Sequence, residues 1–488
     1  MSLTKASYSL ITGAPINVVD YGADPTGAVD SAAVIQSILN SAPNNTQVFI
    51  PVGTYLISST IVFPATSKNI RLTGYGATFT VGAGRHSCID LTAESENYGW
   101  HTVEGLTIQG PNNYYAISMA NSDGAGILIR RTTNNINAAY NTEIRDCNIQ
   151  GFKYGIRMRN AIKVRVEGKT FIRFNNYGIY IDGWVANANS INDAIISLND
   201  TAGFYSDTVA GSTAQPTNNV ISNCLLESNH PYSVTPVFGG IAIYLNNSYD
   251  NIFENCYTED QQYSVYLTGA SKGNKFNSCR FAPGSFGNDI ILISGADTWD
   301  NVFTNCKSAV VSRNTPNVET DNANQLYNQF LDCEGFNFIA SSIVKMPYIQ
   351  NLRPVDYSAD LGGAGYVAIP EQGVRNNVFE GTTPGTITGI GTATATLNCF
   401  GLGEIQFETA VAAAATNTTI TTFSRLQKGQ FIVLWNYQNT RSVIIKGSGA
   451  FGSIVPKGGI DATMNDYGQQ IVFYVNSLGR AYEVGRNF

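Results

Sequence analysis

Short segments in which apolar and polar residues alternate recur along the middle of the chain. Residues 251–260 read NIFENCYTED, and related segments begin with NVISNC at Asn219, NKFNSC at Asn274, NVFTNC at Asn301 and NQFLDC at Asn328. In each segment an Asn stands five residues before a Cys. Such alternation predicts short strands that bury one face and expose the other.

The spacing of these segments predicts a solenoid. The cysteines of the five segments lie 32, 23, 27 and 27 residues apart, and a Gly follows Cys147 and Thr170 after eight residues. A unit of this length with three short strands is typical of a parallel β-helix. Leucine-rich repeats share the period, but their Leu framework is absent from this chain.

The repeated polar and Cys positions are interpreted as structural. We expect each Cys to be a small, reduced, buried side chain. The polar residue before each Cys suits a tight bend, because Asn tolerates left-handed backbone conformations. Stacked Asn side chains can also form a hydrogen-bonded ladder.

One helix is predicted ahead of the repeats. In DSAAVIQSILNSAP the apolar residues of 34–39 share one face, and Asp30 or Ser31 can cap the N-terminus. The open end of a strand stack needs a cover. We therefore expect a capping helix near residues 30–42.

After about residue 345 the pattern changes. Residues 346–395 are rich in Gly and Thr and are expected to connect two domains. Residues 396–488 contain alternating segments such as QFIVLWNY and QIVFYV between turns, which predicts an antiparallel β-sandwich. The expected order is an N-terminal arm over 1–18, a β-helix over 19–345, the connection and the sandwich.

Composition narrows the function classes. Only 13% of residues are charged and the net charge is −7, which argues against a nucleic-acid partner. We find no apolar run long enough to span a membrane and no signal-peptide pattern in the first fifteen residues. Three His and no clustered ligands argue against a metal site, and no cofactor motif is recognisable.

Carboxylates stand three residues after the Cys in only two consecutive units, at Glu227 and Glu259. If Cys points inward, both point outward, one above the other, about 4.8 Å apart along the stack. Two stacked carboxyl groups share a proton, and an acid beside a carboxylate is what glycoside hydrolysis requires. Asp260 can replace either partner, and Asp193 and Asp200 are reserve acids. Solvated surface glutamates or glycan binding without cleavage remain alternatives.

Aromatic and ionisable residues near these carboxylates are candidates for substrate binding. Three follow directly after a repeat Cys, where Tyr suits stacking on a sugar and the cations suit an acidic sugar, although solvated surface charge is the alternative. The others lie in two insertions that can form walls of a groove. The six candidates are Tyr257, Arg280, Lys307, His230, Tyr232 and Trp184.

The opening of the chain resembles a known family. INVVDYGADPTGAVDSAAVIQSIL, followed by VFIPVGTYLIS, resembles the start of pectate-lyase-like right-handed β-helices. LTKASYSLITGAPINVVDYGA is similar to the start of the β-helical region of phage tailspikes and capsule depolymerases. The similarity covers residues 4–345. It implies a right-handed parallel β-helix with a C-terminal domain for trimer assembly or glycan binding.

The resemblance also implies a function. Such proteins are homotrimers of the virion tail, made in the host cytoplasm without a signal peptide, and they bind or cut a bacterial capsule or O-antigen. The N-terminal arm is expected to attach to a phage tail or baseplate protein or to another spike. Tailspike hydrolases commonly use Asp/Glu pairs on neighbouring units, so endo-glycosidic hydrolysis is the leading hypothesis. A lyase that uses Arg280, Lys307 or Tyr257, and a non-catalytic receptor-binding spike, remain alternatives.

Overall fold

The protein is described from a computed structural model. Several sequence predictions fall outside the described residues, namely most of the N-terminal arm, Trp184, Tyr232, Cys399 and most of 346–395. The described residues are 13–64, 68–82, 86–93, 100–111, 124–131, 139–183, 185–208, 215–230, 240–282, 291–294, 298–308, 318–320, 328–334, 336, 338–340, 348–350, 374–375, 378–379, 385–386, 395–398, 404–407, 418–424, 431–436, 443–447, 454–457, 461–466, 469–476 and 480–487.

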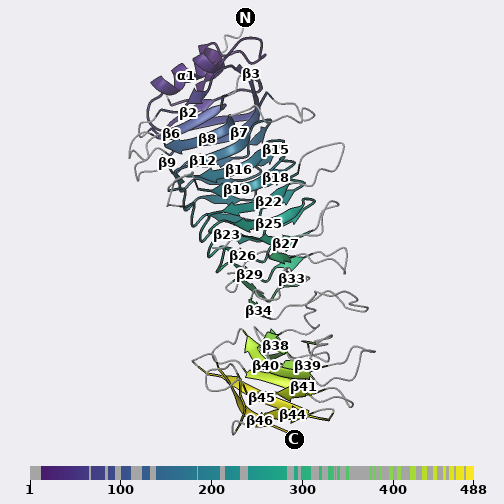
Figure 1. Cartoon of the computed structure of the whole chain (residues 1–488). Helices are drawn as coiled ribbons and strands as arrows, with labels where there is room; N and C mark the ends of the chain where they lie inside the picture. Colours follow the sequence, from purple (N-terminus) through teal and green to yellow (C-terminus); the bar gives the residue numbers. More distant parts are fainter. Residues whose placement is uncertain are drawn as a thin grey trace, which may run out of the picture. The chain divides into compact units, whose positions relative to one another are not determined.

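The chain divides into two compact units, one formed by Met1–Val302 with Cys306–Asn322 and the other by Phe303–Asn305 with Ala323–Phe488. In the first unit, parallel strands stack along one axis (Figure 1). Each full turn of this stack, called a rung below, has a longer strand followed by two strands of two or three residues. The three strands of one rung pair in parallel with those of the next, as β22–β25, β23–β26 and β24–β27 do. The predicted parallel β-helix is confirmed.

The strands of the stack, in chain order, are β1 (Ile16–Asn17), β2 (Thr46–Phe49), β3 (Gly53–Ile57), β4 (Ile61–Val62), β5 (Ile70–Val81), β6 (Ile89–Ala93), β7 (Thr102–Gln109), β8 (Ala125–Arg131), β9 (Ala139–Tyr140), β10 (Glu143–Arg145), β11 (Asn148–Gln150), β12 (Tyr154–Arg159), β13 (Ala161–Ile162), β14 (Arg165–Glu167), β15 (Phe171–Arg173), β16 (Tyr177–Asp182), β17 (Ser190–Asn192), β18 (Ile195–Ser197), β19 (Ala202–Asp207), β20 (Val220–Ser222), β21 (Leu225–Glu227), β22 (Ile241–Asn246), β23 (Ile252–Glu254), β24 (Tyr257–Glu259), β25 (Tyr263–Thr268), β26 (Lys275–Asn277), β27 (Arg280–Phe281), β28 (Ile291–Ile293), β29 (Val302–Thr304), β30 (Lys307–Ser308) and β31 (Val318–Thr320).

The repeated Cys side chains line the interior of the stack. Cys224, Cys256 and Cys279 are each about 1% exposed, and no described cysteine is in a disulfide. The Cys256 thiol donates to the backbone oxygen of Ile221 on the preceding rung, at 3.5 Å. The residue before each Cys has a positive φ, 53° at Asn223 for example, which confirms the predicted left-handed bend.

The Asn at the start of each repeat is fully buried and forms the predicted ladder. Asn219 Nδ2 donates to Asn251 Oδ1 at 2.8 Å, and Asn251 Nδ2 donates to Asn274 Oδ1 at 2.9 Å. Each of these oxygens also accepts the backbone N–H of the Asn one rung earlier. The side chains therefore satisfy backbone groups at a bend where strand pairing cannot reach them.

The predicted capping helix is present as α1 (Ala32–Ser41), preceded by a single 3₁₀ turn at Val18–Tyr21. At its N-terminus Asp30 Oδ1 accepts the backbone N–H of Ala32 at 3.1 Å. The Gln36 amide accepts the N–H of Val62 and donates to its carbonyl, so α1 satisfies backbone groups of β4, the first strand of its sheet. A helix in this place protects an open sheet edge.

The second unit contains two sheets that enclose an apolar core with Leu434, Ile445, Met464 and Phe473. Its strands are β32 (Gln329–Leu331), β33 (Phe338–Ala340), β34 (Tyr348–Gln350), β35 (Val374–Arg375), β36 (Val378–Phe379), β37 (Gly385–Thr386), β38 (Ala395–Asn398), β39 (Glu404–Phe407), β40 (Thr418–Ser424), β41 (Phe431–Asn436), β42 (Val443–Ile445), β43 (Ile454–Val455), β44 (Ala462–Met464), β45 (Gln469–Val475) and β46 (Ala481–Arg486).

The two-sheet arrangement agrees with the predicted sandwich, but its strand pairing is mixed. Pairs β41–β45, β45–β46 and β42–β44 are antiparallel, as expected. Strands β37 to β42 instead alternate between the two sheets and pair in parallel, as in β39–β41 and β40–β42. Alternating apolar residues show that a strand is half-buried and do not show its direction, so the sequence could not reveal this. The domain boundary at residue 396 remains a prediction.

Candidate functional site

Glu227 and Glu259 are in register on adjacent strands. Parallel pairing of β21 with β24 sets Leu225 beside Tyr257, Leu226 beside Thr258 and Glu227 beside Glu259. The middle pair is fully buried, and both glutamates are half-buried on the outer face. Backbone hydrogen bonds just beyond the strands, Leu198 N–H to Glu227 O and Ser228 N–H to Glu259 O, keep the two rungs aligned. The predicted stacking of this carboxylate pair is therefore observed.

The residues after each Cys form the predicted row. Tyr257 pairs with Arg280, and Arg280 pairs with Lys307. The Tyr257 hydroxyl donates to Glu259 Oε2 at 2.8 Å, and the Arg280 guanidinium lies 5.6 Å from the centroid of the Tyr257 ring. Burial, followed by the hydrogen bond to Glu259, raises the pKa of Tyr257. A tyrosine and two cations thus extend the outer face from the carboxylate pair toward later rungs.

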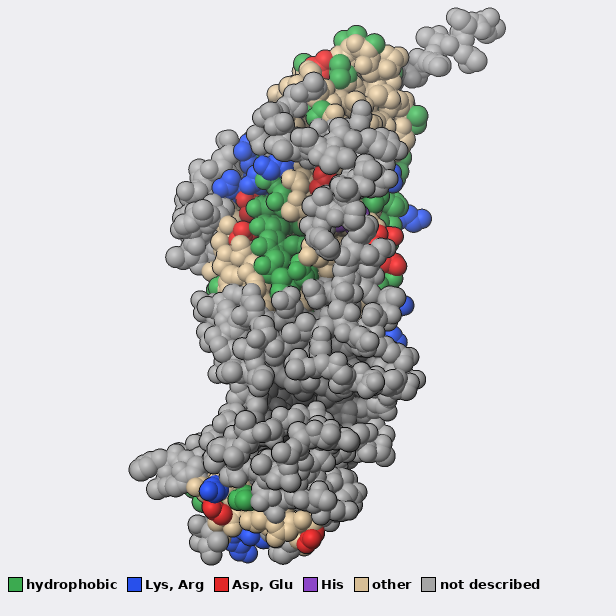
Figure 2. Space-filling model, turned by 45° about the vertical axis from the view of Figure 1, so that its right-hand side comes forward, with side chains coloured by type: hydrophobic (Ala, Val, Ile, Leu, Met, Phe, Trp, Pro, Cys, Tyr) green, Lys and Arg blue, Asp and Glu red, His purple; other side chains and the backbone are tan. Residues whose placement is uncertain are grey.

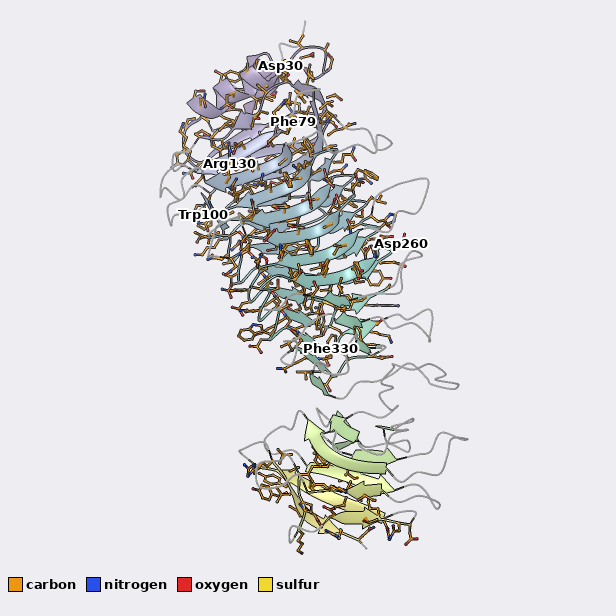
Figure 3. The ribbon with its side chains drawn as sticks, in the orientation of Figure 1. Asp30, Phe79, Trp100, Arg130, Asp260 and Phe330 are labelled. Carbon is orange, nitrogen blue, oxygen red and sulfur yellow. The ribbon has the colours of Figure 1, made fainter. Side chains whose placement is uncertain are left out.

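Asp260 lies at the bend that follows Glu259, with a positive φ of 58°. Figure 3 labels it at the outer edge of the stack, on the opposite side from Arg130. Its Oδ2 accepts from the Ser228 hydroxyl at 3.3 Å and lies 3.8 Å from His230 Nε2. The bend therefore brings a third carboxylate and an imidazole to the end of the glutamate pair.

Asp200 joins the same cluster from the preceding rung. Asp200 and His230 each follow a buried Asn, and Asn199 Nδ2 donates to Asn229 Oδ1 at 2.8 Å. The two residues consequently occupy equivalent positions on adjacent rungs. Burial raises the pKa of Asp200 to about 6, against the opposing effect of His230. A carboxyl group with this pKa can hold a proton near neutral pH and release it to a substrate.

The structure thus gathers four carboxyl groups and one imidazole at one edge of three rungs. We call this set the carboxylate edge: Asp200, Glu227, His230, Glu259 and Asp260. Sequence reasoning held Asp200 only in reserve, because the glutamate column was sought and not the column one bend later. Comparing SLND, ESNH and TEDQ would have placed Asp200 and His230 in one column.

The other reserve acid lies elsewhere. Asp193 is exposed at the bend before β18, at the opposite end of that strand from Asp200, and accepts a hydrogen bond from the Asn192 amide at 2.7 Å. The cluster therefore does not include it. In the described part of the chain, no group of three or more His, Cys, Asp or Glu side chains is arranged to hold a metal ion.

A column of tyrosines on the sheet of longer strands was not predicted. Tyr180, Tyr205, Tyr244 and Tyr266 pair in register, with ring centroids 4.7, 4.6 and 4.9 Å apart. Figure 2 shows a continuous green group on this face, with Arg and Lys in blue at one end. Neighbouring rings cover much of each other's faces, so the column chiefly stabilises the sheet.

The fold and the carboxylate edge define a class: right-handed parallel β-helices with ionisable side chains on the outer face of successive rungs. A family model described as Rhamnogalacturonase A/epimerase, pectate lyase-like, matches residues 15–282. The chain belongs to this pectate-lyase-like family, as the resemblance in its opening residues implied. No curated protein matches the chain.

Solved structures agree on the fold. The A-module of mannuronan C-5 epimerase AlgE6 from Azotobacter vinelandii is 13% identical, with a TM-score of 0.50 over 70% of this chain and 100% of that one. ORF18 of Geobacillus virus E2 is 15% identical, with a TM-score of 0.45 over 69% of this chain and 62% of that one.

Tailspike protein 2 of Escherichia coli O157:H7 bacteriophage CAB120 is 12% identical, with a TM-score of 0.49 over 69% of this chain and 46% of that one. The chain thus spans less than two thirds of both viral proteins. Separately, no helix in the described part of the chain is long and apolar enough to cross a membrane.

Proposed function

We propose that this chain is a phage tailspike that binds a bacterial surface polysaccharide, capsule or O-antigen, and depolymerises it by endo-glycosidic hydrolysis. One observation carries the proposal: the carboxylate edge combines a carboxyl group whose pKa is raised to about 6 with three further carboxylates. Hydrolysis of a glycosidic bond needs an acid for the leaving oxygen and a carboxylate for the anomeric carbon or its attacking water. The family name, which includes a rhamnogalacturonase, supports a polysaccharide substrate.

In this proposal Asp200 is the general acid, because its raised pKa keeps it protonated in weakly acidic solution. The base or nucleophile is one of Glu227, Glu259 and Asp260. Tyr257 holds Glu259 in place through its hydroxyl and offers part of its ring to a sugar. His230, between Asp200 and Asp260, can carry positive charge that favours ionised carboxylates beside it.

The assembly belongs to the same proposal. Three copies form a homotrimer of β-helix domains over 19–345, and the sandwich over 396–488 assembles the trimer or binds glycan. The N-terminal arm attaches the spike to a phage tail or baseplate protein or to another spike, so the protein acts from the virion tail. The tailspike titles among the structural relatives agree with this location, although they establish the fold alone.

A lyase that uses Tyr257 as base is the second candidate, because Arg280 and Lys307 stand beside it to bind a uronate carboxylate. The raised pKa of Tyr257 works against this role, since less phenolate is present at neutral pH. The third candidate is a receptor-binding spike that does not cut. The products distinguish all three.

The test is to incubate the protein with purified capsules and O-antigens and to analyse the products by mass spectrometry. Hydrolysis gives oligosaccharides with new reducing ends, which is the expected result. An unsaturated terminal sugar that absorbs in the ultraviolet would identify a lyase. Intact polymer that is nevertheless bound would identify a receptor-binding spike, and either outcome would overturn the hydrolase assignment.

A further inference from the structure

A pocket lies on the same sheet as the glutamate pair, toward the N-terminal end of the stack. Its volume is about 380 Å³, which lies within the range of small-ligand sites. The residues that line it come from three consecutive segments around β11 and β15. They are Asp146, Cys147, Asn148, Lys169, Phe171 and Arg173.

Arg173 is held in this pocket without an opposite charge. Its guanidinium carbon lies 5.9 Å from the Phe171 ring centroid and 5.4 Å from the Phe174 ring centroid. Within the described residues, neither Arg173 nor Lys169 forms an ion pair, whereas Arg71, Arg130 and Arg157 each pair with a carboxylate. Aromatic rings fix the orientation of a guanidinium without neutralising it, which leaves its charge for a ligand.

Two polar atoms of the pocket lack partners. Among the described residues, Arg173 Nε and Asn148 Oδ1 are buried and accept or donate no hydrogen bond. Such atoms cost free energy unless water or a ligand satisfies them. The pair offers one donor, which suits an anionic oxygen, and one acceptor, which suits a sugar hydroxyl. An acidic sugar carries both groups.

The acid in the pocket does not cancel these cations. Asp146 Oδ1 accepts the backbone N–H of Lys169 at 2.9 Å, and its Oδ2 accepts the Tyr75 hydroxyl at 2.8 Å. Both oxygens are therefore engaged in holding the pocket together. With Lys169 and Arg173 positive and Asp146 negative, the pocket keeps a net charge of about +1 at neutral pH.

The pocket is aligned with the carboxylate edge. Arg173 pairs with Ser197, and Ser197 pairs with Glu227, so the guanidinium column reaches the first glutamate after two rungs, about 9.6 Å along the axis. Phe171, Ile195, Leu225 and Tyr257 form the adjacent column on the same face. One polymer lying along the stack can therefore reach both places over an apolar track.

We propose that this pocket binds an anionic sugar unit of the polymer that the carboxylate edge cuts, with Arg173 contacting the carboxylate or phosphate group. The substrate is then an acidic polysaccharide. This inference rests on the proposed function for the word "cuts", but binding in the pocket can be measured without cleavage. The Arg fork matches both kinds of oxyanion, so the experiment has to separate the two sources.

The experiment uses the full chain carrying Asp200→Asn, so that bound sugar stays intact. Calorimetry measures binding of oligomers of galacturonate, glucuronate and mannuronate, of their carboxyl-reduced neutral forms, and of a glycerol-phosphate oligomer. Arg173→Gln is compared with Arg165→Gln, which makes the same charge change at an exposed residue of β14 that does not line the pocket. Each series is repeated at high salt, which screens exposed charges.

At least one anionic oligomer is expected to bind about tenfold more tightly than its neutral form, in line with a charge-assisted Arg contact. Arg173→Gln should abolish this preference and Arg165→Gln should keep it. Tighter binding of glycerol phosphate than of any uronate would assign the anion to phosphate. Equal binding of charged and neutral forms, or equal effects of the two substitutions, would overturn the inference.

Cleavage assays keep the two proposals apart. If the parental protein cuts no polysaccharide while Arg173-dependent anion binding persists, the proposed hydrolysis fails and the pocket stands. If a polymer is cut while charged and neutral oligomers bind alike, the pocket assignment fails and hydrolysis stands. In a cutting enzyme, Arg173→Gln should raise KM and leave kcat within about twofold, since it acts on binding away from the bond that breaks.

Discussion

At the residue scale, burial distinguishes the carboxyl groups of the carboxylate edge. Asp200 stands directly after a buried Asn, and its own burial raises its pKa to about 6. Asp260 stands at a bend with a hydroxyl donor and an imidazole nearby. Two acids at the same edge thus have different surroundings, and such a difference is what allows an acid and a base to act together.

The pH dependence of cleavage follows from this pKa. If protonated Asp200 delivers the proton, the rate should fall about tenfold per pH unit above about pH 6, where the acid form is lost. Asp200→Asn should lower the rate by about 10²–10⁴-fold and remove that limb of the profile. Reducing-end assays from pH 4 to 9 measure both. A parental rate that rises steadily to pH 8 would contradict the assignment.

The stability of the protein should respond to the same group. A raised pKa means that the folded state binds this proton more tightly than the unfolded state, so the stabilisation is present below the ordinary pKa of 3.8 and is lost as pH rises through about 6. Asp200→Asn should therefore raise the unfolding temperature more at pH 7.5 than at pH 4. Calorimetric scans at the two pH values test this, and an equal shift at both would contradict it.

The glutamate pair gives a third prediction at this scale. Glu227→Gln and Glu259→Gln keep side-chain size and remove the ionisable group, so each should lower cleavage at least ~10²-fold. Glu254→Gln is the matched control, since Glu254 is exposed on the neighbouring strand β23. Unfolding temperature and polysaccharide binding should change little in all three variants. If both pair variants cleave at the parental rate, the base is Asp260.

At the element scale, each short strand is held in register by buried side chains at its two bends. The Asn ladder joins side-chain amides to backbone N–H groups over successive rungs, with Asn189, Asn219, Asn251 and Asn274 all fully buried. Strands of three residues make few ladder hydrogen bonds of their own. The bends are therefore essential to the register that aligns Glu227 with Glu259.

Breaking the ladder should be costly. Asn251→Ala leaves the buried N–H groups of Asn219 and the oxygen-facing amide contact to Asn274 unsatisfied, so the free energy of unfolding should fall by roughly 1–3 kcal/mol. Asn277→Ala, at a half-buried position on β26, is the control and should cost less. Denaturant unfolding followed by circular dichroism measures both. Equal losses would show that the ladder contributes nothing specific.

At the scale of the whole molecule, each unit covers its apolar interior in its own way. In the first unit, α1 covers the edge of β4, and successive rungs cover one another. In the second unit, two sheets enclose a core from Phe423 to Ala481. Parallel pairing between distant segments requires long loop closure, so such a stack forms slowly and, once formed, also opens slowly.

The proposed homotrimer gives the prediction at this scale. The mass in dilute buffer should be about three times the 52.6 kDa of one chain. Thermal unfolding should depend on scan rate, because a trimer of stacked rungs loses its structure through a high kinetic barrier. Light scattering after size-exclusion chromatography measures the mass. A single species at the mass of one chain would contradict the assembly.

The sequence by itself determined the repeat, the inward Cys and Asn positions, the capping helix and the outward, aligned glutamates. These follow from local periodicity, because residues two apart on a strand share a face and the residue before each Cys sets a bend. The sequence could not show that strands β37 to β42 pair in parallel, because alternation is the same in both directions. It also could not show the raised pKa of Asp200 or the unpaired Arg173, because burial and ion pairing depend on neighbours that are remote in the chain. Tertiary structure alone decides which of the outward charges find partners.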